Sequence, residues 1–177
     1  MSLSQGDITA SAGYKATYVA SWSSFTPAQA FFSIQGSATK IVKVLRIGFS
    51  GTQTTASTII PVLTITDALF PGVGVSVAPT GIVPFDSNSP AATATPRTYT
   101  ANTTGGGAVV GFIKNVKFTV PVAAAASAGQ NEYIFNFTSN FSQDVVIRGT
   151  SEVVSLTLLG VTLTGGSTSI WVEWTEE

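Results

Sequence analysis

The stretch YKATYVASW, residues 14–22, indicates the fold of this chain. Its even-numbered positions are all apolar or aromatic, and the positions between them are mostly small or polar. In an extended chain, successive side chains point to opposite faces, so this pattern is typical of a strand buried on one side. Sustained helical periodicity is nearly absent from the rest of the 177 residues.

Short segments of the same kind follow along the chain, separated by Gly, Pro and Ser. We expect further strands at 30–35, 40–50, 57–67, 97–102, 109–122, 132–138, 144–148, 153–159 and 169–175. About ten short strands without crossover helices predict an all-β fold, an antiparallel β-sandwich. The long connection at 68–96 favours a jelly-roll-like arrangement, in which strands cross between sheets. We expect one domain over residues 1–177, with residues 1–13 as an N-terminal arm.

The strand at 40–50 cannot alternate regularly without burying Lys43 among apolar side chains. An unpaired buried Lys costs several kcal/mol, so we predict a β-bulge near Leu45–Arg46. The bulge would place four apolar side chains on one face: Val42, Val44, Ile47 and Phe49.

Two further positions predict local irregularity. Pro61 has no N–H to donate, so its segment is predicted to be an edge strand or to begin irregularly. Asp86 is predicted to cap a short helical turn through residues 90–92.

The composition argues against several classes of function. The chain has no His and no Cys, and only 10% of its residues are charged, against roughly 25% in an average soluble domain. A Ser-His-Asp triad, a His-ligated metal and a thiolate–zinc site are therefore excluded. We expect no enzyme activity and no cofactor. The net charge of −1 predicts neither nucleic acid nor an anionic membrane as partner.

The remaining charged residues are scattered, and we interpret most acids as solvated charges at strand ends. Arg148 and Glu152 flank a tight turn, which predicts an ion pair that braces it, within the protein or at a subunit contact. A ligand-binding Arg148 is the alternative.

Tryptophans lie on both faces of the predicted last strand. Ile170, Val172 and Trp174 point to one face, and Trp171 points to the other. If one face is core, the other Trp is exposed or at an interface, where Trp is enriched. We expect interface residues at Trp171, Tyr99 and Trp22.

Three segments in the middle of the chain belong together: Pro84-Phe-Asp86-Ser-Asn88, Ala91-Ala-Thr93-Ala-Thr95 and Arg97-Thr-Tyr99-Thr-Ala101-Asn102. They resemble a block common in small structural proteins of tailed phages and prophages. Two segments resemble the early strand pair of these phage proteins: Ser37-Ala-Thr39-Lys40 and Ile47-Gly-Phe49-Ser-Gly51-Thr52. Two others resemble their C-terminal part: Ile147-Arg148-Gly149-Thr-Ser-Glu152 and Val172-Glu173-Trp174-Thr-Glu-Glu177.

This resemblance implies a virion protein of the jelly-roll capsid decoration, or cement, type. It would be made in the bacterial cytoplasm and would stabilise the phage head from the capsid surface. Its partners would be other copies, as a homotrimer, and the major capsid protein. The alternative is a tail- or fibre-associated module that binds a receptor or carbohydrate.

Overall fold

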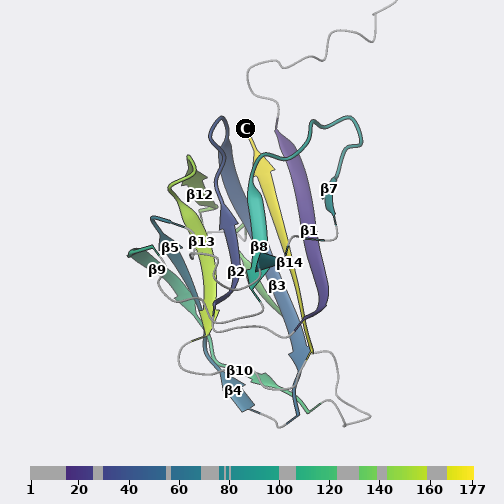
Figure 1. The fold of residues 1–177 in the computed structure, drawn as a ribbon, viewed down its shortest axis with the longest axis vertical. Helices are drawn as coiled ribbons and strands as arrows, with labels where there is room; N and C mark the ends of the chain where they lie inside the picture. The colour runs from purple at the N-terminus through teal and green to yellow at the C-terminus, as the bar shows by residue number, and fades with distance from the viewer. Residues whose placement is uncertain are drawn as a thin grey trace, which may run out of the picture.

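The protein folds into two antiparallel β-sheets packed against each other, and this confirms the predicted all-β sandwich (Figure 1). The computed structural model describes residues 15–25, 30–54, 57–68, 76–77, 79, 81–99, 107–122, 132–138, 143–158 and 167–177. Within this part of the chain, no helix has the length and apolar character needed to cross a membrane. The predicted N-terminal arm, residues 1–13, lies outside the described residues.

The first sheet has the strand order β11-β3-β14-β1-β7, with β12 also paired to β3. Its strands are β1 (Ala16–Phe25), β3 (Ile41–Thr52), β7 (Ile82–Pro84), β11 (Glu132–Asn136), β12 (Val145–Arg148) and β14 (Ser167–Glu176).

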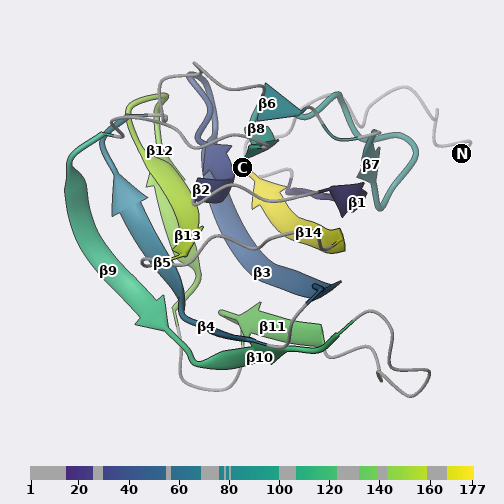
Figure 2. The same cartoon turned by 60° about the horizontal axis from the view of Figure 1, so that its bottom comes forward.

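The second sheet has the order β6-β8-β2-β13-β5-β9, and a separate pair joins β4 to β10 (Figure 2). Strands that follow one another in sequence often alternate between the sheets: β1 and β3 belong to the first sheet, and β2 between them belongs to the second. The strands are β2 (Ala30–Gln35), β4 (Ser57–Ile59), β5 (Pro61–Thr66), β6 (Ser76–Val77), β8 (Thr95–Tyr99), β9 (Val109–Asn115), β10 (Phe118–Val120) and β13 (Val153–Leu158).

The core lies between the two sheets and is built from alternate residues of each strand. In β1 the side chains of Ala16, Tyr18, Ala20 and Trp22 are buried, as the alternation predicts. Tyr18 stacks on Trp174 of the neighbouring β14, with ring centroids 5.6 Å apart. Burying a large apolar side chain contributes about 1.5–3 kcal/mol, so these alternating positions drive the sheets together.

The predicted β-bulge is present at Leu45. In the pairing of β14 with β3, Glu173 lies opposite Arg46 and Trp174 lies opposite Val44, so Leu45 is the extra residue. The peptide N–H of Phe137 donates to the carbonyl of Leu45 at 2.9 Å. The bulge brings the predicted four side chains to the core face: Val42, Val44, Ile47 and Phe49.

The structure distinguishes the alternatives at Pro61 and corrects the prediction at Asp86. Pro61 is the first residue of β5, which lies between β13 and β9. The predicted strand at 57–67 is interrupted at Ile60, between β4 and β5, which lie in different sheets, so the irregular start is confirmed, whereas the edge position is wrong. Asp86 caps no helical turn: its carboxylate accepts from the Asn88 N–H at 2.9 Å, and its carbonyl accepts from the Ser89 N–H at 2.9 Å. This is a short-range turn of the kind that Asp favours.

Candidate functional site

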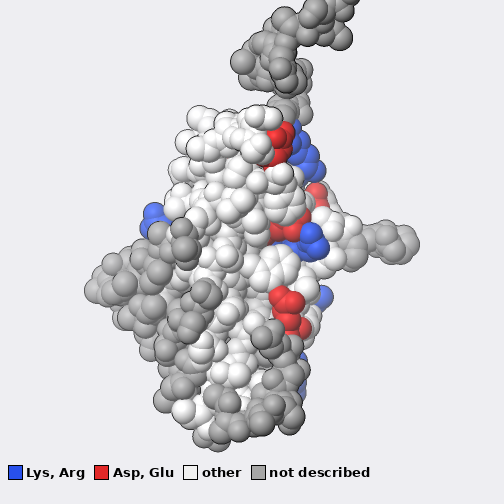
Figure 3. All heavy atoms as spheres, turned by 90° about the vertical axis from the view of Figure 1, so that its right-hand side faces the viewer, with Lys and Arg blue, Asp and Glu red and all other residues white. Residues whose placement is uncertain are grey.

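The outer face of the first sheet carries several charged side chains around an aromatic ring. Strand pairing places Gly48 of β3 between Trp171 of β14 and Ile134 of β11. In the adjacent row, Arg46 of β3 lies beside Glu173 of β14. Figure 3 shows acidic and basic side chains next to one another in a band down one face of the molecule, beside a broad uncharged area.

Trp171 is the half-buried centre of this group. Its indole N–H donates to the Glu132 carboxylate at 2.6 Å, and the Arg46 guanidinium carbon lies 6.0 Å from the ring centroid. A Cβ at Gly48 would collide with the Cε2, Nε1 and Cζ2 atoms of the indole. The absence of a side chain at Gly48 therefore lets the indole pack directly against the backbone of β3.

Glu173 forms a charge-assisted bond next to this ring. The Arg46 Nη2 atom donates to Glu173 Oε2 at 2.5 Å, and Glu173 is only 7% exposed. A nearly buried carboxylate needs such a partner, because removing a charge from water is costly. The interpretation of most acids as solvated strand-end charges is therefore wrong for Glu173.

Glu176 is a fully buried carboxylate at the end of β14. Its Oε1 atom accepts hydrogen bonds from the backbone N–H groups of Thr93 and Ala94, each at 2.9 Å. Its Oε2 atom accepts from the Thr93 hydroxyl at 2.7 Å. The indole N–H of Trp174 donates at 3.1 Å, and the Lys40 ammonium lies 3.6 Å away. These contacts tie the 93–94 segment to β14.

The environment of Glu176 changes its acidity. Burial alone would raise the pKa of the Glu176 carboxyl, but the hydrogen bonds from Ala94, Thr93 and Trp174 outweigh burial and hold the pKa below its usual range. Sequence reasoning missed this residue. The signal was available, because alternation along β14 places Glu176 on the same face as Val172 and Trp174.

The predicted ion pair between Arg148 and Glu152 is replaced by a backbone contact within the chain. The Glu152 carboxylate accepts from the peptide N–H of Arg148 at 2.6 Å. The ion pairs among the described residues are Lys40–Glu176, Lys43–Glu177 and Arg46–Glu173, and none includes the Arg148 guanidinium. The turn between Arg148 and Glu152 contains Gly149, whose φ of 70° suits a residue without a Cβ.

Two of the three expected interface residues lie in the interior instead. Trp22 is 5% exposed and packs edge-to-face on Phe32, with centroids 5.8 Å apart. Tyr99 is buried, its hydroxyl lies 2.7 Å from the Ser33 hydroxyl, and burial raises the pKa of its phenol. Their aromatic rings fill spaces within the chain, so neither ring can act as a surface anchor in this fold. Trp171 remains partly accessible.

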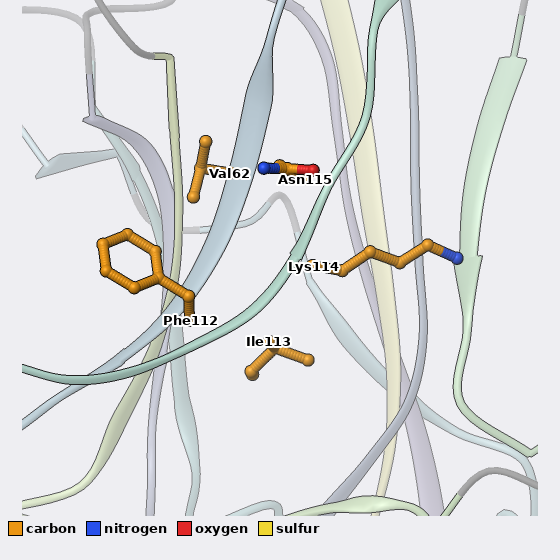
Figure 4. A pocket seen from close by; sticks show the side chains of 5 residues that line it. All are labelled: Val62, Phe112, Ile113, Lys114 and Asn115. Carbon is orange, nitrogen blue, oxygen red and sulfur yellow. The ribbon is translucent and has the colours of Figure 1, made fainter.

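Apolar side chains are exposed at the strands that end the two sheets. Val83 and Phe85 are exposed at β7, and a second group is exposed on β9: Val109, Val110 and Phe112. Beside β9 lies an open depression of about 240 Å³ (Figure 4). Typical small-molecule pockets have volumes of about 300–1,000 Å³, so this depression is small. Its lining residues are Val62, Phe112, Ile113, Lys114 and Asn115.

Among the residues that the structure describes, no group of three or more acidic side chains could hold a metal ion. Three comparisons with known proteins found no match. No family model matches the chain. No curated protein matches it, and no solved structure does.

Proposed function

We propose that this chain is a structural protein whose function is assembly. It binds a protein shell as a homo-oligomer, in the manner of the jelly-roll decoration proteins that its sequence resembles. On a phage capsid, a trimer of this chain would hold neighbouring subunits of the major capsid protein together and resist the pressure of packaged DNA. Its work would need no catalytic residues and no cofactor.

The proposal rests mainly on one observation: exposed apolar side chains lie on the outermost strands of both sheets, as Phe85 beyond β7 and Phe112 on β9 illustrate. Large exposed apolar side chains that cluster on a surface mark interaction sites. The electrostatics support this view, because a net charge of −1 gives copies little reason to repel one another.

The energetics of a shell also suit many weak contacts. A standard protein interface buries roughly 1,600 Å², and much of the gain from apolar burial is lost to the costs of association. Copies that bind one shell at several points gain avidity without any new contact. A β-sandwich that binds weakly at each contact but is present in many copies is therefore sufficient to stabilise a shell.

Capsid binding tests this function directly. Purified protein is mixed with capsids of a tailed phage whose genome encodes this chain, after the capsids have been stripped of the protein. We expect it to sediment with the capsids as an oligomer and to raise their melting temperature, with stripped capsids alone as control. A chain that neither sediments with the capsids nor stabilises them would overturn the proposal.

A second candidate function is carbohydrate binding at the outer face of the first sheet. One observation favours it: the half-buried Trp171 ring lies beside the Glu132 carboxylate and the Arg46 guanidinium. An aromatic ring with a few placed polar groups is a usual lining of ligand sites. Screening on a glycan array tests it: Trp171→Ala should abolish binding, and Phe112→Ala, which changes an exposed aromatic side chain on the second sheet, should preserve it. No binding to any glycan would exclude this candidate.

A further inference from the structure

A strap of chain lies across one end of the sandwich. It consists of residues 85–94, which lead from β7 of the first sheet to β8 of the second. Figure 1 shows this connection passing the ends of β1 and β14 on its way to β8. Because the strap joins the two sheets, its position determines whether the core between them is covered at this end.

Apolar burial contributes little to holding the strap in place. Residues 85–88, 90–91 and 93 are exposed, and Ala94 is the one buried residue of the strap. Segments with few buried apolar contacts open locally at a lower cost in free energy than the strands around them. The strap is therefore held mainly by hydrogen bonds.

Most of these hydrogen bonds end on one carboxylate. Glu176 of β14 accepts from three donors of the strap: the Thr93 N–H, the Thr93 hydroxyl and the Ala94 N–H. Two further contacts assist it. The Tyr18 hydroxyl donates to the Pro90 carbonyl at 2.8 Å, and the Thr93 hydroxyl lies 2.7 Å from the Ser37 hydroxyl. Loss of the acceptors on Glu176 would remove the main attachment of the strap.

The side chains around Glu176 make its attachment sensitive to protonation. Ala16 of β1 and Val42 of β3 flank it in the sheet and offer no hydrogen bond from their side chains. The Lys40 ammonium lies 3.6 Å away and stays charged in acid. Protonation of Glu176 would leave this cation without its partner as well.

The other ionisable groups at this end do not connect the strap to the sheets through a charge. Tyr18 reaches Pro90 through a neutral phenol, and the Asp86 carboxylate bonds within its own turn. The Lys43–Glu177 pair projects from the opposite face of the first sheet, since Glu177 alternates with Glu176. Among the described residues, Glu176 is thus the acid whose protonation acts on the attachment of the strap.

We propose that the strap is an acid-released cover: protonation of Glu176 frees residues 85–94 and exposes Tyr18 and Trp174, while the two sheets stay folded. A protonated carboxyl turns one acceptor oxygen into a donor, so it cannot accept every bond from the strap. The stacked rings of Tyr18 and Trp174 are fully buried while the strap is closed. This device is independent of the proposed assembly function.

The direction of the pH dependence follows from the two states of the strap. In the closed state burial raises the pKa of Glu176, but the hydrogen bonds from Ala94, Thr93 and Trp174 outweigh burial and hold the pKa below its usual range. Opening removes the strap donors, and the pKa returns toward about 4.3. The closed state is therefore favoured above about pH 5 and loses this advantage as the pH falls toward the closed-state pKa.

Hydrogen exchange of the wild-type protein, measured by mass spectrometry, tests the opening. After correction for the intrinsic exchange rate, the peptide that contains Thr93 and Ala94 should exchange at least threefold faster at pH 3 than at pH 6. Peptides from β3 and β13 should keep their protection over this range. Acrylamide should quench tryptophan emission more strongly in acid, because Trp174 becomes accessible. If the strap and the strands lose protection together, the proposal is wrong.

Glu176→Gln imitates the protonated carboxyl at neutral pH. The variant should speed exchange of the same peptide at least tenfold at pH 6 and should remove most of its further increase in acid. Glu177→Gln changes the neighbouring exposed carboxylate and should behave like the wild type. Wild-type protection of the strap in Glu176→Gln would overturn the proposal. Far-UV circular dichroism verifies the strands, and the wild-type titration decides by itself should the variant not fold.

Tyr18→Phe separates the attachment at Pro90 from the titrating group. It removes the hydroxyl that bonds to Pro90 and keeps the ring that stacks on Trp174. Exchange of the strap at pH 6 should rise at least threefold, and its increase in acid should persist because Glu176 is intact. Disappearance of that acid increase would contradict the assignment of the titration to Glu176.

Discussion

The indole of Trp171 occupies the space that a side chain at Gly48 would need. The two residues are cross-strand partners in the pairing of β14 with β3. The same indole donates a hydrogen bond to Glu132 on β11. The position of the Trp171 ring therefore depends on its packing against the backbone of β3 and on its hydrogen bond to the Glu132 side chain. This relationship ties three strands of the first sheet together at its outer face.

Replacing Gly48 with Ala should therefore displace the indole and break its bond to Glu132. Overpacking of this kind costs about 1–3 kcal/mol in the free energy of unfolding, measured by urea denaturation. Iodide should quench the tryptophan emission more strongly, because the displaced ring becomes more accessible. Gly81→Ala is the control, since a Cβ there meets nothing within 4 Å. Unchanged stability and quenching in Gly48→Ala would contradict the packing.

Replacing Glu176 with Gln should destabilise the fold. The side-chain NH₂ of Gln can only donate, so it would face the hydrogen-bond donors of Thr93, Ala94 and Trp174 in place of a carboxylate oxygen. Some of these buried donors would then have no acceptor. The expected loss is about 2–3 kcal/mol in the free energy of unfolding, measured by denaturant titration. Glu177→Gln, at an exposed position, is the matched control and should change stability little. Equal stabilities of the two variants would refute the role assigned to Glu176.

The stability of the protein should fall on acidification. The folded-state pKa of Glu176 is lower than its unfolded value of about 4.3, so its contribution is fully present above about pH 5 and disappears as the pH falls toward the folded pKa. The chain has no His, so stability should be nearly flat between about pH 6 and 7. Thermal unfolding between pH 3 and 7 measures this, and Glu176→Gln should show a smaller acid decline.

Two ion pairs on β3 should differ in energetic value. Arg46→Met leaves the nearly buried Glu173 carboxylate without its partner and should lower the free energy of unfolding by about 1–2 kcal/mol. The loss is no larger because the Arg46 side chain is 42% exposed, so that solvent screens part of the attraction. Lys43→Met removes the pair with Glu177, in which both side chains are accessible, and should cost less than about 0.5 kcal/mol. Denaturant titration compares them, and a larger loss for Lys43→Met would reverse this order.

The stability of the turn at Gly149 should depend on the Glu152 side chain and not on the Arg148 side chain. Glu152→Ala removes the acceptor for the Arg148 N–H and should cost about 1 kcal/mol. Arg148→Gln preserves that backbone bond and should change the free energy of unfolding by less than about 0.5 kcal/mol. A double-mutant cycle measured by denaturation checks this, and a coupling above about 1 kcal/mol would restore the side-chain ion pair.

Much of the local structure could be predicted without coordinates. The alternation in residues 14–22 places Ala16, Tyr18 and Ala20 on one buried face, and the desolvation cost of Lys43 predicts the bulge at Leu45. These predictions succeed because the direction of a side chain along a strand, and the cost of burying its charge, are local properties. The same reasoning correctly separates the faces of Trp171 and Trp174.

The candidate site was less accessible to sequence reasoning. Trp171 was identified, but its contacts with Glu132 and Arg46 were not. The prediction of Trp22 and Tyr99 at an interface is wrong, because the enrichment of aromatic residues at interfaces does not distinguish a surface ring from a core ring. Arg148 and Glu152 were paired from the proximity of their side chains, whereas the turn gives the carboxylate a closer backbone donor.

The sequence by itself determined that this chain is all-β, which residues of each strand share a face, and where the longest strand must bulge. Only the tertiary structure decided which strands are neighbours. Glu176 meets Thr93, 83 residues away in sequence, and Gly48 lies beneath Trp171. Alternation determines the direction of each side chain but is equally compatible with many pairings. The pairing is selected by the packing of the whole sandwich, to which distant segments contribute together.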